Sequence, residues 1–242
     1  MASELERPFA VFDIDGTVIR WQLYHALNDA LAQKGIIDKK AFDQVKEARM
    51  SWKRRSADQS FRDYEQALVK VFEQELVGLS VKDLNQAAED VFEEYKDQVY
   101  IFTRDLIRSL KAKNYLLFAV SGSPDIIVEK LVNYYGFDDF AASSFEARDG
   151  RYTGATQISV GEKPELLNKL IDKHHATKNG SIAVGDSEGD IDMLKLTEEP
   201  IAFNPSSELL LYATEHQWSV VVERKNVIYK MNYKNGEYLL AL

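Results

Sequence analysis

The sequence predicts an α/β protein in which an all-helical cap is inserted directly after the first strand of a parallel sheet. Four short segments are apolar on both faces and end in turn residues followed by helix-start signals. This pattern is typical of buried parallel strands joined by helices. Between the first two strands, a stretch of roughly 80 residues contains only amphipathic helical patterns. These observations indicate a Rossmann-like parallel sheet core with a helical insertion.

The elements follow from apolar runs and the turn signals that end them. The predicted strands are Phe9–Ile14, Tyr115–Val120, Ser181–Val184 and Pro200–Phe203. Helices are expected in the gaps, at about 124–135, 164–175, 188–194 and 206–216, because these ranges begin with capping residues. The segment 144–153, centred on Asp149-Gly150, predicts a β-hairpin.

The predicted organisation is a catalytic core of residues 1–20 and 101–242 and a helical cap domain of residues 21–100. In open α/β sheets, ligands bind at the carboxyl ends of the strands. The cap follows the first strand at that edge, so we expect it to roof the site.

Composition excludes several classes of protein. Of the 242 residues, 45% are hydrophobic and 29% are charged, which indicates a globular protein rather than a disordered one. No apolar window is long enough to cross a bilayer, and no signal peptide is expected at the N-terminus. The net charge of −9 opposes binding to nucleic acid or anionic membranes. The absence of cysteine fits a cytoplasmic location, which we expect.

Two pairs of carboxylates follow two of the predicted strands. Gly16 ends the first strand and lets Asp15 curl back toward Asp13, while Asp186 and Asp190 straddle the turn after the third strand. Taken singly, each pair also fits an ordinary turn or helix cap. Because parallel strands end at one sheet edge, both pairs address one site, and clustered carboxylates repel unless a hard cation lies among them. Oxygen ligands without His or Cys favour Mg²⁺.

Two further features are expected at the same edge. In Ser121-Gly122-Ser123-Pro124, the proline suits the first helical position and Ser123 suits the cap, so backbone N–H groups form an anion site. Lys163 precedes a proline at the start of another helix, where the helix dipole gives no reason for a cation. Helix capping and a solvated lysine are the structural alternatives.

In this order, the four motifs resemble those of haloacid dehalogenase superfamily phosphatases. They are Asp13-Ile-Asp-Gly-Thr17, the strand-ending Ser121-Gly-Ser123, Lys163 before a helix, and Gly185-Asp-Ser-Glu-Gly-Asp190. The helical insert after the first motif resembles the cap of the phosphoserine-phosphatase-like branch, subfamily IB. The segment Trp218–Val222 resembles the closing strand of that family.

The resemblance implies a catalytic role for three side chains. Asp13 would be the nucleophile that takes the phosphoryl group, forming an aspartyl-phosphate. Asp15 would protonate the leaving oxygen and later activate water, and Lys163 would neutralise negative charge on Asp13 and the phosphate.

The resemblance also implies binding roles. Mg²⁺ would be bound by Asp13, Asp186 and the carbonyl of Asp15, with Asp190 supporting the metal site. The residues assigned to substrate binding, which either contact the substrate or brace the nucleophile loop, are Thr17, Ser121, Gly122 and Gln22.

Gln22 also marks a departure from the family. Phosphoserine phosphatases usually carry glutamate at this position, and the cap arginine that would bind the substrate carboxylate is absent from its expected place. Phosphoserine is therefore predicted to be a poor substrate. A neutral or differently charged head group, such as a polyol or sugar, would be held by Gln22 with Arg20 or Trp21.

The function expected from these features is that of a Mg²⁺-dependent phosphomonoester hydrolase acting on a small phosphorylated metabolite. Three alternatives retain phosphate chemistry: a phosphotransferase or phosphomutase with the same intermediate, phosphoserine phosphatase proper, and a response-regulator-like domain that accepts phosphate on aspartate. A binding protein without activity is the fourth alternative. The survival of all four motif groups favours the hydrolase.

Overall fold

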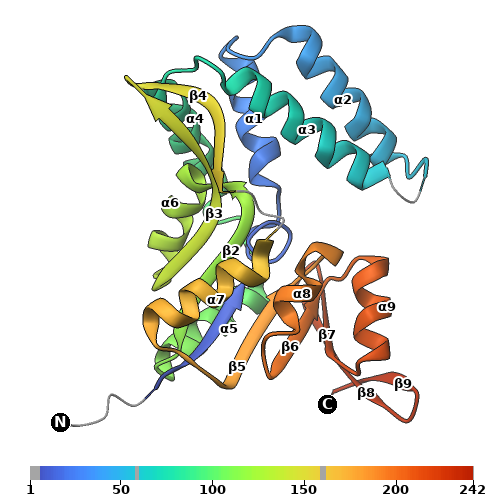
Figure 1. Cartoon of the computed structure of the whole chain (residues 1–242). Helices are drawn as coiled ribbons and strands as arrows, with labels where there is room; N and C mark the ends of the chain where they lie inside the picture. The colour runs from blue at the N-terminus through green and yellow to red at the C-terminus, as the bar shows by residue number, and fades with distance from the viewer. Residues whose placement is uncertain (1–5, 58–59, 159–161, 242) are drawn as a thin grey trace, which may run out of the picture.

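The computed structural model describes residues 6–57, 60–158 and 162–241. A nine-stranded sheet runs through the molecule in the order β4-β3-β2-β1-β5-β6-β7-β8-β9 (Figure 1). Strands β3, β2, β1, β5, β6 and β7 are parallel to their neighbours, whereas β4 at one edge and β8 and β9 at the other are antiparallel. The strands are β1 Pro8–Phe12, β2 Leu116–Pro124, β3 Asp139–Arg148, β4 Arg151–Ile158, β5 Thr177–Gly185, β6 Glu199–Phe203, β7 Ser219–Arg224, β8 Val227–Lys234 and β9 Glu237–Leu240.

Side chains of the central strands alternate between two apolar cores, which explains why each strand is apolar on both faces. Ala10 and Phe12 of β1 pack in one core, and Phe9 and Val11 pack in the other. Helices α5 and α6 cover the first face, and α7, α8 and α9 cover the second. Their bounds are α5 Ile101–Ala112, α6 Asp125–Tyr135, α7 Lys163–His174, α8 Ile191–Leu194 and α9 Ser207–Glu215.

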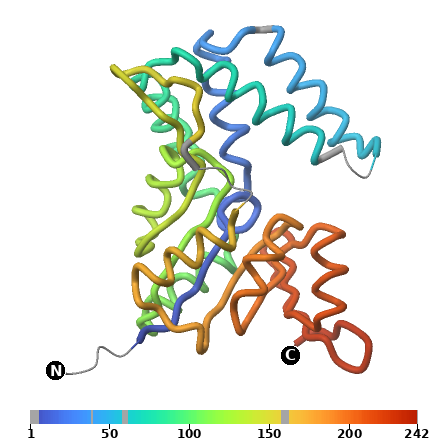
Figure 2. The backbone as a smooth tube through the Cα atoms, in the orientation of Figure 1, coloured from blue at the N-terminus to red at the C-terminus, as the bar shows by residue number. Residues whose placement is uncertain are grey.

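Four helices occupy the segment between β1 and α5. They are α1 Leu23–Gln33, α2 Lys39–Lys53, α3 Ser60–Leu76 and α4 Val81–Tyr95. The chain enters and leaves this segment through neighbouring backbones, because the N–H of Arg20 donates to the carbonyl of Gln98 at 2.8 Å and that of Tyr100 donates to the carbonyl of Val18 at 3.1 Å. Figure 2 shows α2 and α3 projecting beyond the carboxyl ends of the strands. The domain limits 1–20, 21–100 and 101–242 remain a prediction.

The predicted fold class is confirmed, with several local differences. All four predicted strands and the hairpin at Asp149-Gly150 are present, but helix α5 and strands β8 and β9 were not predicted. The expected role of Ser123 as a helix cap is wrong, because β2 extends to Pro124, which occupies the cap position of α6. Among the described residues, no helix combines the length and apolar character that a bilayer crossing requires.

Candidate active site

Three carboxylates meet at the carboxyl ends of β1 and β5. Asp13 directly follows β1, Asp186 directly follows β5, and Asp190 ends the short 3₁₀ turn Glu188–Asp190. One oxygen from each of the three lies within 4.8 Å of the others. The central strands β1 and β5 are hydrogen-bonded neighbours, so the sheet itself brings the two acidic pairs together as predicted.

Lys163 joins two of these carboxylates. Its Nζ donates to Asp13 Oδ1 at 2.9 Å and to Asp190 Oδ1 at 2.6 Å, and the side chain is buried at the first residue of α7. Burial alone would lower the pKa of Lys163, but the two carboxylates outweigh it and raise that pKa above its usual value. These ion pairs supply the reason for a cation at the start of a helix, and the lysine therefore remains charged.

Asp190 holds both Lys163 and the turn after β5 in place. Its Oδ2 accepts hydrogen bonds from the N–H groups of Asp186 and Ser187, both at 3.0 Å, while Oδ1 accepts from Lys163. A β-carbon at Gly185 would overlap the Asp190 side chain, so the glycine permits this close approach. Both oxygens of Asp190 are thus engaged, which suits a positioning residue better than a direct ligand.

Asp186 has the donor chemistry that a hard cation needs. No described residue forms a hydrogen bond or ion pair with its carboxylate, which lies against the Cα of Gly16. Burial, followed by repulsion from Asp13 and Asp190, raises the pKa of Asp186 well above its usual value. Burial likewise raises the pKa of Asp13, although Lys163 opposes this. Lys163 supplies a single positive charge to three carboxylates, so a divalent cation fits this donor set.

Asp15 is held at the start of the first cap helix. Its Oδ1 accepts from the N–H of Leu23 at 2.5 Å, and its Oδ2 accepts from the hydroxyl of Ser121 at 3.1 Å. Burial raises the pKa of Asp15, while these two hydrogen bonds oppose the rise. A raised pKa favours the protonated form, which is the form a general acid requires.

The predicted phosphate-binding residues are only partly placed on the cleft. Gly122 and Ser123 line it, whereas Ser121 is fully buried and directs its hydroxyl to Asp15. Of the two roles predicted for the substrate-binding set, Thr17 fits the bracing role, because it is fully buried and is not among the residues that line the cleft. Its carbonyl accepts from the hydroxyl of Thr103 at 2.9 Å, which fits a bracing position in the nucleophile loop.

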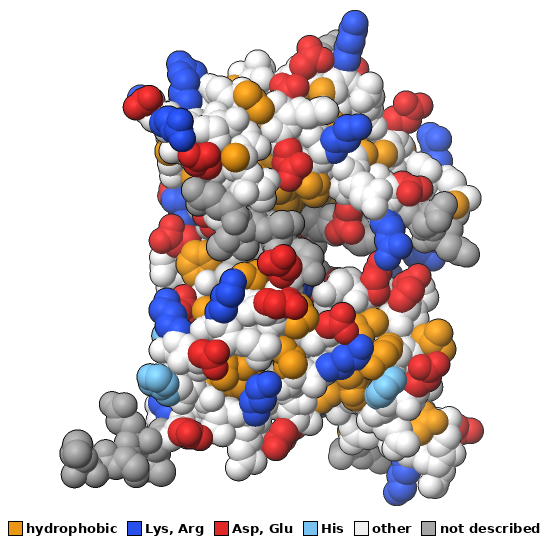
Figure 3. Space-filling view, viewed as in Figure 1, with side chains coloured by type: hydrophobic (Ala, Val, Ile, Leu, Met, Phe, Trp, Pro, Cys, Tyr) orange, Lys and Arg blue, Asp and Glu red, His pale blue; other side chains and the backbone are white. Residues whose placement is uncertain are grey.

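A cleft of about 750 Å³ lies between these residues and α3. Figure 3 shows this region as a hollow with acidic and basic side chains on its rim. Gln22 lines the cleft, but the expected contribution of Arg20 or Trp21 is wrong. Arg20 pairs with Glu223 at 3.6 Å, and Trp21 stacks on Tyr95 with 6.1 Å between ring centroids.

The side of the cleft formed by the helical segment between β1 and α5 was not predicted from the sequence. Charged residues of α3 line it, at positions that recur on one helix face. The spacing of these charges was visible in the sequence, but a charged helix face is usually solvated, so spacing alone did not distinguish it. These residues are Arg62, Glu65, Lys70 and Glu73.

Known phosphatases resemble this chain in sequence and in fold. A histidinol-phosphatase from Neisseria meningitidis is 24% identical over 226 residues, which are 88% of this chain and 97% of that protein. A phosphoserine phosphatase from Methanocaldococcus jannaschii is 33% identical over 102 residues, covering 41% of this chain and 48% of that protein. The fold matches a solved phospho-aspartyl intermediate analogue of phosphoserine phosphatase with a TM-score of 0.61 and 22% identity, covering 92% of this chain and 96% of that one.

The family comparison covers both the catalytic motifs and the cap. Residues 10–195, well over half of the chain, match the haloacid dehalogenase-like hydrolase family. This range runs from the first strand through Asp190, and it therefore includes all four motifs. The predicted family membership and the predicted hydrolase class are confirmed, and the chain belongs to the haloacid dehalogenase-like hydrolase family.

Proposed function

We propose that this chain is a Mg²⁺-dependent phosphomonoesterase that hydrolyses a small phosphorylated metabolite through an aspartyl-phosphate on Asp13. The observation that carries the proposal is the placement of Lys163 between Asp13 and Asp190, beside the carboxylate of Asp186, which has no hydrogen-bond or ion-pair partner among the described residues. A carboxylate needs no general base to act as a nucleophile, and its main obstacle is repulsion from the phosphate. Lys163 reduces that repulsion.

In the first step, an oxygen of Asp13 forms a bond to phosphorus while the bond from phosphorus to the alcohol oxygen breaks. Asp15 gives its proton to the departing oxygen, so the product leaves as a neutral alcohol. The hydrogen bonds from Leu23 and Ser121 fix the Asp15 carboxyl group at the mouth of the cleft. These contacts support Asp15 as the acid, because they orient its carboxyl group in the cleft that Asp13 also lines.

In the second step, Asp15 has become a carboxylate and takes a proton from water. The water oxygen attacks phosphorus, the bond between phosphorus and Asp13 breaks, and inorganic phosphate leaves. The same residue therefore serves as acid and then as base, and the enzyme returns to its starting protonation state. Gly122 and Ser123 line the cleft, where the predicted anion site would hold phosphate oxygens. The N–H of Ser123 already donates to the hydroxyl oxygen of Ser121 at 3.1 Å, so Gly122 is the better candidate for this role.

Mg²⁺ would be held by the carboxylates of Asp13 and Asp186, with the Asp15 carbonyl as a further ligand and Asp190 in a supporting position. When bound, it supplies charge neutralisation to the phosphate and to the carboxylate cluster. Asp190 keeps its hydrogen bonds to Lys163 and to the Asp186 backbone, which orients the lysine and the turn that carries Asp186.

The substrate assignment is supported at the level of a small phosphorylated metabolite. The names of the relatives make phosphoserine and histidinol phosphate the first natural phosphomonoesters to assay. A phosphomutase or phosphotransferase would use the same Asp13 chemistry but pass the phosphoryl group to an alcohol. A cytoplasmic location without nucleic-acid or membrane partners remains our expectation.

The test is release of phosphate from para-nitrophenyl phosphate in the presence of Mg²⁺ and again after EDTA. We expect turnover that is lost with EDTA and restored by excess Mg²⁺. Adding acceptor alcohols separates hydrolysis from transfer, because transfer yields a new phosphomonoester in place of free phosphate. Turnover that is indifferent to EDTA would contradict the metal assignment.

A further inference from the structure

Helix α3 contributes Glu65 and Glu73 to the cleft lining together with two cations, Arg62 and Lys70, of which Arg62 is already paired. Along the whole cleft, the described lining residues include seven carboxylates and three cationic side chains. Mg²⁺ offsets part of this excess, but a phosphate group brings negative charge of its own. The part of a substrate that faces α3 therefore gains from carrying positive charge.

The cations near the cap are largely engaged already. The guanidinium of Arg62 pairs with Glu188 at 3.0 Å, and Lys163 is buried between its two carboxylates. In contrast, the carboxylates of Glu65 and Glu73 form no hydrogen bond or ion pair with any described residue. Lys70 likewise has no partner within the described ranges, so the face of α3 that lines the cleft offers two available carboxylates and one available ammonium group.

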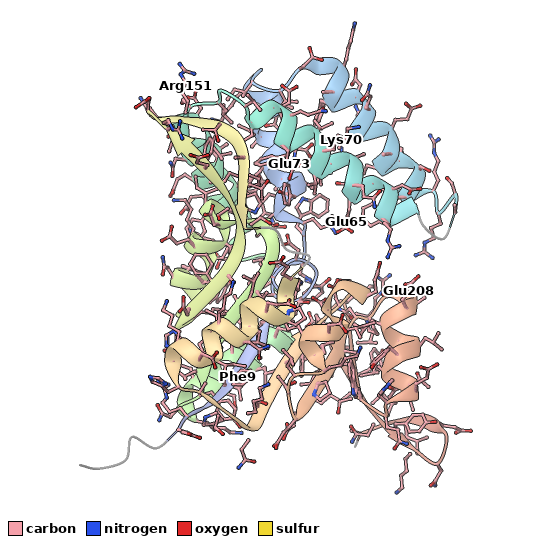
Figure 4. All side chains as sticks on the ribbon, in the orientation of Figure 1. Phe9, Glu65, Lys70, Glu73, Arg151 and Glu208 are labelled. Carbon is pink, nitrogen blue, oxygen red and sulfur yellow. The ribbon has the colours of Figure 1, made fainter. Side chains whose placement is uncertain are left out.

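Helix α3, which forms the cap wall of the cleft, is held near both ends, so the backbone that carries Glu65 and Glu73 is in place before substrate arrives. After the C-terminal end of α3, the N–H of Gly78 donates to the carbonyl of Tyr152 at 2.9 Å, and Arg151 donates to the carbonyl of Gly78 at 2.7 Å. Near its N-terminal end, Arg62 spans the cleft to Glu188. Figure 4 shows Glu65 and Glu73 along α3, with Arg151 on the neighbouring hairpin. Preorganised charge lowers the cost of binding.

Apolar side chains lie beside the two carboxylates. Tyr24, Leu68 and Phe145 line the same cleft and are buried. Burial raises the pKa of the Tyr24 hydroxyl above its usual value, and repulsion from Glu73 adds to this effect. A cleft lined by both apolar side chains and carboxylates suits an organic ammonium, whose hydrocarbon part is apolar and whose nitrogen is charged.

The carboxyl group of Glu65 lies near other carboxylates and has no cationic partner among the described residues. Although its side chain is open to solvent, the walls of the cleft partly desolvate the carboxyl group. This desolvation, with repulsion from Asp15 and Glu188, raises the pKa of Glu65 to about 7. A bound cation would relieve the repulsion.

We propose that Glu65 and Glu73 select phosphomonoesters whose alcohol carries a cationic amine and no carboxylate. This inference rests on the phosphatase function proposed above. It specifies the expected head group as a positively charged amino alcohol, in place of a neutral polyol or sugar. A carboxylate on the substrate would face Glu65 and Glu73, with Lys70 as its only available cationic partner among the described residues of the wall. Phosphoserine, which adds that carboxylate, is therefore disfavoured.

The test compares 3-aminopropyl phosphate with n-butyl phosphate, which replaces the ammonium with a methyl group of similar size. Phosphoserine is measured beside them, and para-nitrophenyl phosphate reports the catalytic machinery. The variants are Glu65→Gln, Glu73→Gln and their double mutant. Asp63→Asn is the matched control, because it removes a charge from the exposed face of the same helix without touching the cleft.

We expect wild type to favour the amine over the butyl ester by roughly tenfold or more in kcat/KM, because a hydrogen bond to a charged group strengthens binding by about this factor. The double mutant should lose this preference, measured as the ratio of kcat/KM for the two esters so that any general loss of activity cancels, and Asp63→Asn should keep it. Equal use of the two esters by wild type would overturn the inference. So would a preference for phosphoserine, or an amine preference that survives in the double mutant. Failure of the proposed function is a different result, namely no turnover of any phosphomonoester with Mg²⁺.

Discussion

The carboxylate of Asp186 lies so close to the Cα of Gly16 that a β-carbon at Gly16 would overlap it. The glycine also has a φ of +79°, in the left-handed region that side chains disfavour. Gly16 therefore serves both the turn after β1 and the placement of Asp186, the proposed metal ligand that follows β5. This contact links two motifs that are about 170 residues apart in the chain.

Gly16→Ala should abolish Mg²⁺-supported turnover, because its methyl group displaces Asp186 from the carboxylate cluster. The matched control is Gly35→Ala, since Gly35 has a φ of +70° and no atom near its added methyl group. Both variants incur a backbone cost of about 1 kcal/mol, so both should lose a similar amount of thermal stability. Turnover and Mg²⁺ titration should separate them. A Gly16→Ala enzyme with a normal Mg²⁺ titration would show that the contact is unimportant.

Asp13→Asn should remove activity by about three orders of magnitude or more without unfolding the protein. The amide keeps the shape of the side chain but loses the nucleophile and an anionic ligand, and Lys163 retains its ion pair with Asp190. Removing one of three crowded carboxylates also reduces repulsion, so the melting temperature without metal should not fall. The measurements are para-nitrophenyl phosphate turnover and thermal unfolding. Activity within tenfold of wild type would eliminate Asp13 as the nucleophile.

Asp15→Asn should impair poor leaving groups more than good ones. A nitrophenolate departs with little help, whereas an alkoxide needs the proton that Asp15 supplies. We expect the loss in the first step to be at least about tenfold greater for n-butyl phosphate than for para-nitrophenyl phosphate, measured in single-turnover reactions that follow release of the alcohol. Equal losses for the two esters would mean that Asp15 does not act as the acid. The asparagine can still accept the N–H of Leu23, so the start of α1 should persist.

Much of the site could be predicted because its residues adjoin strand ends. Asp13, Asp15, Asp186 and Asp190 each follow an apolar strand within a few residues, and parallel strands bring such positions to one edge. Lys163 was harder to interpret, because its local position at a helix start opposes a cation. Its explanation is tertiary, since the carboxylates of Asp13 and Asp190 come from distant parts of the chain.

Helix α5 was missed for a similar reason. Tyr100 occupies its N-cap and offers no side-chain cap, so the usual local signal is absent. The first N–H groups are satisfied by Glu223 of β7, which accepts from Ile101 at 3.1 Å and from Phe102 at 2.8 Å. Because the residue that caps the helix is about 120 positions away in the chain, it leaves no pattern in neighbouring residues. The residues of α3 that line the cleft could not be predicted either, because only the packing of the helix shows which of its faces borders the cleft.

The proposed amine selectivity should depend on pH through Glu65. Its pKa is raised from 4.5 to about 7 by desolvation in the cleft and by repulsion from Asp15 and Glu188. Below that pH the carboxyl is largely neutral and offers an ammonium no ion pair, whereas above it the carboxylate is ionised. The charged groups that act on this pKa are Asp15, Glu188 and Asp190, which raise it, and Lys163, which lowers it, while Arg62, Lys70 and Glu73 line the same cleft.

The ratio of kcat/KM for 3-aminopropyl phosphate to that for n-butyl phosphate should therefore rise between about pH 6 and about pH 8. Using the ratio cancels the titration of Asp13, Asp15 and the phosphate group, because both esters share them. A Glu65→Gln enzyme should give a flatter and lower ratio, while Asp63→Asn should follow wild type. A ratio that falls as pH rises would mean that the amine is not paired with an ionising carboxylate. A rise that persists in Glu65→Gln would assign the titration to another group, with Glu73→Gln as the next variant to measure.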